Sequence, residues 1–201
     1  NETALYQKLG VIQIPGSGTT VNVPIDGGAT NVFVSTAEAV AFDRDAPALG
    51  QVAMTLAKYT KKVQLSLELL QDEDSALMAF LNKYVGDAMA LTHNSLLVTE
   101  ALANGTAGLT LAGAAAITAA EIPALMYKLK EQYDPGAAWL MNRTVEGYLR
   151  GFTGNNFQFV PTPQGSIGGS TRELFGKPIH NSTYMPLATT GLKSLVYGNF
   201  S

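Results

Sequence analysis

A long helix, predicted over residues 75–103, is the strongest pattern in the sequence. Acidic residues at 72–74, followed by Ser75, supply capping side chains and negative charge at its start. Apolar residues then recur every three or four positions, as in an amphipathic helix. They are Leu77, Phe80, Leu81, Tyr84, Val85, Ala88, Met89 and Leu96. Because no proline interrupts it, this helix would extend for about 43 Å at 1.5 Å per residue, and the fold has to accommodate it.

Three segments before this helix alternate apolar and polar residues, which is typical of β-strands. The residues on the apolar face of each segment are Val21, Val23 and Ile25; Val52, Met54 and Leu56; and Val63, Leu65 and Leu67. The first strand is predicted over residues 19–25. The part of the chain that precedes the long helix is therefore expected to form a sheet.

The segment between the first two strands, residues 26–50, is too long for an ordinary loop in a compact domain. One interpretation is a two-stranded arm whose legs of about 12 residues would reach roughly 40 Å. Such a hairpin is marginally stable by itself, so it needs a partner surface, which we expect to be another subunit. The candidate intersubunit contacts are Phe33, Val34, Phe42, Asp43, Arg44 and Asp45. A disordered lid and a hairpin folded back on its own domain are the alternatives.

A second helix is predicted over residues 119–132. Thr118 and Glu121 have the spacing of a capping box, in which each side chain bonds the other residue's backbone N–H. An apolar stripe formed by Ile122, Leu125, Met126 and Leu129 follows. The sequence Tyr-Asp-Pro-Gly at 133–136 then predicts a turn.

A short apolar strand is predicted over residues 137–141. Asn142 and Thr144 can cap a third helix that ends near Gly151. The rest of the chain has the pattern of short strands and glycine-rich loops. Because helices and strands are mixed without a regular βαβ repeat, the predicted fold class is α+β.

Charged residues are scarce and unevenly placed. They make up 14% of the 201 residues, against roughly 25% in a typical globular domain. None occurs in residues 9–25, 101–120, 151–171 or 178–192. Such neutral stretches suit surfaces that contact other proteins, although ordinary Gly-, Thr- and Ala-rich loops have the same composition.

The composition also excludes several classes of protein. With a net charge of −3 and a pI of about 5.3, the chain lacks the excess of basic residues that is typical of a dedicated nucleic-acid-binding protein. The absence of cysteine excludes disulfides, thiolate zinc sites and cysteine nucleophiles, and favours a reducing compartment. No segment has the length and apolarity of a membrane span.

No motif indicates a catalytic, cofactor or metal site. The sequence lacks a complete phosphate-binding loop, a dinucleotide-binding loop and a nucleophile elbow. The two histidines, His93 and His180, are far apart and have no ligand-spaced partners. Two acid pairs could hold a divalent cation, but a solvated helix start and a loop tip explain them better. These pairs are Asp72 with Asp74 and Asp43 with Asp45.

Four segments, in order, resemble those of a known family. They are residues 61–72 (KKVQLSLELLQD), 138–144 (AWLMNRT), 174–179 (LFGKPI) with Met185-Pro186, and 196–200 (VYGNF). The first resembles the strand-to-helix signature "vSxELLxD" of tailed-bacteriophage major capsid proteins with the Hong Kong 97-like shell fold, and the others resemble later motifs of that family. Together the four segments span most of the chain.

The resemblance implies an α+β capsid fold in which residues 26–50 are the extended E-loop and residues 75–103 the spine helix. The implied parts are a remnant of the N-terminal arm (1–18), part of the peripheral domain (19–112), the axial domain (113–190) and a strand returning to the peripheral domain (191–201). Family chains usually begin earlier and continue further, so we expect parts of the family's full length to be absent here.

By the same resemblance, the expected function is that of a structural major capsid protein of a tailed phage or prophage, not an enzyme. Its copies would form the pentamers and hexamers of an icosahedral shell around double-stranded DNA. The implied further partners are scaffolding and portal proteins and nonspecifically contacted DNA, with assembly in the bacterial host cytoplasm and no membrane. No lysine lies between Lys8 and Lys58, so cross-linking through the E-loop is not expected. An encapsulin-like nanocompartment shell is the main alternative, and a hydrolase using His93 or His180 is a remote one.

Overall fold

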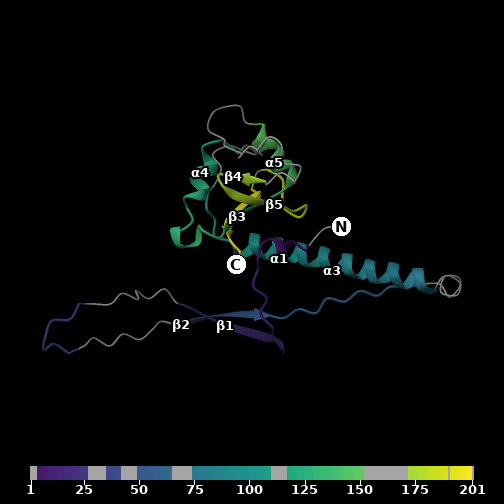
Figure 1. Cartoon of the computed structure of the whole chain (residues 1–201), viewed down its shortest axis with the longest axis horizontal. Coiled ribbons are helices and arrows are strands. Elements are labelled where there is room, and N and C mark those ends of the chain that lie inside the picture. Colours follow the sequence, from purple (N-terminus) through teal and green to yellow (C-terminus); the bar gives the residue numbers. More distant parts are fainter. Residues whose placement is uncertain are drawn as a thin grey trace, which may run out of the picture. The chain divides into compact units, whose positions relative to one another are not determined.

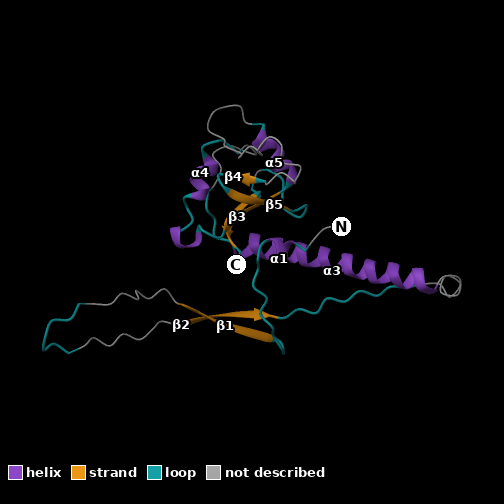
Figure 2. Ribbon diagram, in the orientation of Figure 1, coloured by secondary structure: helices purple, strands orange, loops and turns teal. Residues whose placement is uncertain are grey.

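The chain divides into two compact units, which we describe separately. A computed structural model describes residues 4–26, 35–41, 49–64, 74–109, 117–151, 172–189 and 191–200, without the side chains of 74–76. The hairpin unit is Gln13–Ser66, and the main unit consists of Asn1–Ile12 and Leu67–Ser201. Most of their helices and strands are labelled in Figure 1, and all are coloured by type in Figure 2.

The hairpin unit contains a two-stranded antiparallel sheet. Strands β1 (Thr20–Asp26) and β2 (Leu49–Thr55) pair from Thr20 opposite Thr55 to Asp26 opposite Leu49, which confirms the first two predicted strands. The alternating residues Val21, Val23 and Ile25 share a face with Val52 and Met54 of the other strand, because directly opposite residues point to the same side. One face of this sheet is therefore apolar.

The third predicted strand is not formed where the structure can be described. Residues 61–64 are irregular, and the remainder of that segment, including Leu65 and Leu67, lies outside the described residues. Of the three apolar positions of this pattern only Val63 is described, so the part of the predicted strand beyond it stays a prediction.

The long helix of the main unit is α3 (Asp74–Asn104), which confirms the helix predicted over residues 75–103. Its later half packs against α1 (Leu5–Lys8) at the N-terminus. There the buried Asn94 side chain accepts a hydrogen bond from the Leu5 backbone N–H, with 2.7 Å between Oδ1 and N. Val98, one turn further along α3, is also buried.

A four-stranded sheet forms the centre of the main unit, in the order β4-β5-β3-β6. The strands are β3 (Ala137–Met141), β4 (Glu173–Leu174), β5 (Lys177–Asn181) and β6 (Leu195–Asn199). Strand β3 confirms the strand predicted over residues 137–141. It runs parallel to β5 and antiparallel to β6, and all its residues are buried.

Because β3 is covered on both faces, its side chains belong to two hydrophobic clusters, one on each side of the sheet. Trp139 and Met141 join the first, together with Ile117, Ile122, Val145, Leu149, Leu174 and Ile179. Ala138 and Leu140 join the second, together with Leu5, Leu9, Val98 and Met185. The sheet thus separates α4 and α5 from α1 and α3, as the alternation of a strand requires.

Helix α5 (Arg143–Arg150) begins and ends as predicted. The Asn142 side chain caps it by accepting a hydrogen bond from the Thr144 N–H at 3.0 Å. The helix predicted over residues 119–132 is wrong in length.

Helix α4 covers only Glu121–Met126, and a short 3-10 helix, η1 (Glu131–Tyr133), follows it. Of the predicted capping box, the bond from the Thr118 N–H to the Glu121 carboxylate is formed, at 2.7 Å. The helix does not continue beyond Tyr127, because the Lys128 and Leu129 N–H groups bond carbonyls only three residues back.

Candidate subunit interface

The six predicted intersubunit contacts all fall outside the described residues. They are Phe33, Val34, Phe42, Asp43, Arg44 and Asp45. The interface they would form therefore stays a prediction. What can be described is the surface that the two units present elsewhere.

Each unit exposes large apolar side chains. In the hairpin unit, Ile25, Val52 and Met54 on the apolar face of the sheet are exposed. In the main unit, the first half of α3 exposes Phe80 (63%) and Met89 (61%). Met78, Tyr84, Val85 and Leu91 of the same helix are exposed as well. These exposed apolar side chains are available for contacts with other proteins.

Neither histidine lies in a reactive arrangement. His93 in α3 makes an edge-on ring contact with Tyr6, with ring centroids 5.8 Å apart. His180 lies in β5, where burial and the positive charge of Lys8 lower its pKa. Among the described residues no group of His, Asp and Glu could hold a metal ion. His93 is thus an exposed residue in contact with Tyr6, and His180 is partly buried in the sheet.

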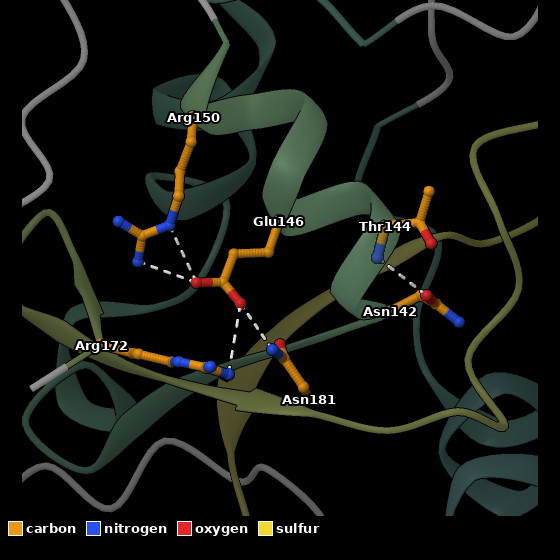
Figure 3. Close-up of polar contacts among 6 residues, drawn as sticks. All are labelled: Asn142, Thr144, Glu146, Arg150, Arg172 and Asn181. Atoms are coloured by element: carbon orange, nitrogen blue, oxygen red, sulfur yellow. Dashed lines mark hydrogen bonds and ion pairs between the residues drawn. The ribbon is translucent and has the colours of Figure 1, made fainter. Parts of the chain in front are cut away.

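A buried carboxylate connects α5 with the edge of the sheet. Figure 3 shows Arg150, Arg172 and Asn181 directed at Glu146, whose side chain is only 6% exposed. Arg150 donates to Oε1 from two nitrogens, at 3.0 and 2.8 Å. Asn181 donates to Oε2, and Arg172 lies 3.6 Å from the same oxygen. One carboxylate is thereby shared by three side chains from different parts of the chain.

The surroundings of Glu146 favour its ionised form. Burial alone would raise the pKa of this carboxyl group. The hydrogen bonds from Asn181 and Arg150 and the charges of Arg172 and Arg150 outweigh burial and hold the pKa below its ordinary value. Glu146 is therefore a stable anion in the folded subunit.

A second polar cluster fixes the turn before β3. The Tyr197 hydroxyl donates to Oδ1 of Asp134 at 2.6 Å, and the Lys177 ammonium lies 2.9 Å from Oδ2. The hydrogen bond from Tyr197, followed by that from Lys177, lowers the pKa of Asp134. Burial and the bond to Asp134 raise the pKa of Tyr197. This cluster ties the turn to both β5 and β6.

Sequence reasoning missed both polar clusters. The i, i+4 spacing of Glu146 and Arg150 was a visible signal for one ion pair. The other partners are distant in sequence, 35 residues for Asn181 and 63 for the Asp134–Tyr197 pair, so no local pattern reveals them.

A groove of about 450 Å³ lies beside the end of α3, between α4 and β6. Its lining is mostly apolar, with Ile122, Leu125 and Leu195 among the side chains, and the charged groups that line it are Glu121, Lys128 and Lys193. The groove therefore offers apolar contact rather than the convergent polar groups of a reaction site. No helix in the described part of the chain is long and apolar enough to cross a membrane.

Solved capsid structures share this fold. The chain aligns over 100% of its length with 75% of a protein from the capsid of a native GTA (gene transfer agent) particle, at 18% identity and a TM-score of 0.78. All of the chain also aligns with 74% of a protein from the capsid of an empty GTA particle, at 19% identity and a TM-score of 0.75. At these identities the likeness establishes the fold, which is the α+β fold of capsid shell subunits.

The family follows from the sequence as a whole. Residues 1–201 match the phage capsid family, and the chain belongs to it. No curated protein matches the chain. The protein is therefore a major capsid shell protein, which is a structural role, and its fold is one found in assembled particles. The predicted family, fold class and function are confirmed, and the encapsulin-like alternative is not favoured.

Proposed function

We propose that copies of this chain form the pentamers and hexamers of an icosahedral shell that encloses double-stranded DNA. The observation that carries this proposal is the apolar surface that each subunit leaves uncovered. Phe80 and Met89 on α3, and Val52 on the hairpin sheet, are exposed to water in the isolated subunit. Contacts with further copies would remove such residues from water, and each buried apolar Å² contributes about 25 cal/mol.

The E-loop assignment is part of the same proposal. Residues 26–50 would lie over a neighbouring subunit and contact it through Phe33, Val34, Phe42, Asp43, Arg44 and Asp45. The antiparallel pairing of β1 with β2 supports this, because it places Asp26 and Leu49, the residues that flank 27–48, opposite each other. The peripheral (19–112) and axial (113–190) domains are proposed on the family resemblance.

Replacing residues 27–48 with Asn-Gly tests the E-loop proposal. This dipeptide favours a two-residue hairpin turn, so β1 and β2 keep their register. We expect a folded subunit, with unchanged fluorescence from Trp139, that forms no shells in electron micrographs. As a matched control, Glu38→Gln alters the same segment without removing its apolar residues and should assemble normally. Shells of normal size and yield from the replacement variant would contradict the assignment.

We further propose that the enclosed DNA is contacted nonspecifically and that scaffolding and portal proteins join assembly in the host cytoplasm. The net charge of −3 argues against a dedicated sequence-reading surface, which is normally basic. Nuclease treatment of particles made from the complete protein during phage production provides the test. Protected DNA of mixed sequence is expected. Particles holding a cargo protein and no DNA would instead identify a nanocompartment shell.

A further inference from the structure

Both histidines of the chain lie beside the short helix α1. His93 of α3 contacts the Tyr6 ring edge-on, with 5.8 Å between the ring centroids. His180 of β5 is close enough to Lys8 for the ammonium charge to act on it. Histidine is the side chain that ordinarily changes its charge between about pH 5 and pH 8. The surroundings of α1 are therefore open to control by pH.

The register of the sheet directs His180 to the side where α1 packs. His180 is paired with Leu140 of β3, and paired residues of neighbouring strands project to the same face. Leu140 belongs to the second hydrophobic cluster, which includes Leu5 and Leu9. The preceding residue, Ile179, belongs to the first cluster on the opposite face, as alternation along a strand requires. His180 is therefore a partly buried group on the face that α1 covers.

Helix α1 depends on its contacts with the rest of the main unit. It has only four residues, too few to be stable by itself. Leu5 and Leu9 pack in the second cluster, and the Leu5 N–H donates to Oδ1 of Asn94. A modest change in the free energy of these contacts is therefore enough to shift α1 between a docked and a released state.

The elements around this face carry few ionisable side chains in their described parts. They are Tyr6 and Lys8 of α1, His93 of α3 and Tyr184 in the loop after β5, whereas β3 carries none. The acidic residues of α3 closest in sequence to His93 are Asp87 and Glu100, and neither is among the groups that shift the pKa of His180. Lys177 of β5 shares the opposite face with Ile179 and pairs with Asp134. No carboxylate among these side chains compensates a positive charge on His180.

The surroundings of His180 favour the neutral imidazole. Burial, followed by the positive charge of Lys8, lowers the pKa of His180. The docked state therefore binds a proton more weakly than a state in which α1 has moved away and water reaches the imidazole. Docking is then complete above the ordinary pKa of 6.5 and weakens as the pH falls through the lower value of the docked state.

We propose that α1 is a pH-controlled latch, which stays docked while His180 is neutral and is released when His180 gains a proton next to Lys8. Release withdraws Leu5 and Leu9 from the second cluster and opens that side of the cluster to water. It also frees the chain as far as Ile12, after which the hairpin unit begins. The latch belongs to the single chain, so it does not depend on the proposed function.

Hydrogen exchange at the Leu5 N–H tests the latch, because the bond of this group to Asn94 joins α1 to α3. After correction for the intrinsic effect of pH on exchange, we expect its protection to fall roughly fivefold between about pH 8 and pH 5. The Trp139 N–H, in the strand between β5 and β6, should keep its protection, as expected for release of α1 without unfolding. Constant protection at Leu5, or an equal loss at Trp139, would overturn the latch.

Three substitutions assign the effect to His180. His180→Gln cannot gain the charge, so the protection of Leu5 should no longer depend on pH. Lys8→Met removes the neighbouring charge at an exposed position and should reduce the fall to roughly twofold, which keeps the test decisive if H180Q does not fold. His93→Gln is the matched control, because it removes the other histidine beside α1 and should leave the fall unchanged. A fall of wild-type size in H180Q or K8M, or its loss in H93Q, would overturn the proposal.

Discussion

Two glycines of the main unit have open space at the Cβ position but differ in backbone conformation. Gly176, in the turn between β4 and β5, has φ +74°, whereas Gly147 lies within α5. Gly176→Ala should lower the free energy of unfolding by about 1 kcal/mol, because an L-residue is strained in the left-handed region. Gly147→Ala should raise it by about 0.5–1 kcal/mol, because alanine favours the helix. Urea denaturation of both variants measures the change in the free energy of unfolding. Changes of the same sign in the two variants would contradict this account.

The lowered pKa of Glu146 predicts how stability depends on pH. Since the folded state favours the ionised form, its contribution is complete above the ordinary pKa of 4.5 and is lost as the pH falls below this value through the folded pKa. Between neutral pH and about pH 3, wild type should therefore lose roughly 1 kcal/mol more stability than E146Q. Denaturation midpoints along a pH series measure this difference. Parallel curves for the two proteins would show that Glu146 does not contribute in this way.

At the scale of elements, what could be predicted from the sequence depended on how local the signal is. Residues 75–103 have a helical periodicity, residues 137–141 are a continuous apolar run, and Asn142 is a helix cap, so α3, β3 and α5 were found. The apolar stripe of α4 continues to Leu129 but its α-helical hydrogen bonds do not, so periodicity alone placed the end of the helix too late. The contact of Arg172 with Glu146 could not be predicted, because the two residues meet only once β5 lies beside β3.

The contact between α1 and α3 depends on one buried amide. Asn94→Leu would leave the Leu5 N–H without its acceptor, so we expect a loss of about 1–3 kcal/mol in stability and faster hydrogen exchange at Leu5. Asn104→Leu is the matched control, because Asn104 is exposed on the same helix, where its side chain donates to the Glu100 carboxylate at 2.8 Å. Its effect should stay within about 0.5 kcal/mol. Similar losses for both variants would argue against a specific role for Asn94.

At the scale of the whole molecule, the scarcity of charge has two physical sources. Several charges that are present serve as internal links, as Lys177 does at Asp134 and Arg172 does at Glu146. Much of the remaining surface, including the first half of α3, is apolar. A subunit that is covered by its neighbours needs fewer charges to stay in solution than a monomer of the same mass. Composition therefore agrees with a shell subunit, although composition alone could not separate contacts from loops.

Electron microscopy of the complete protein, produced with its scaffolding protein if it has one, tests the central claim most directly. The account predicts closed shells, or the pentamers and hexamers from which they form, at concentrations where the apolar faces of hairpin and helix are covered by other copies. A protein that remains strictly monomeric under every assembly condition would contradict it.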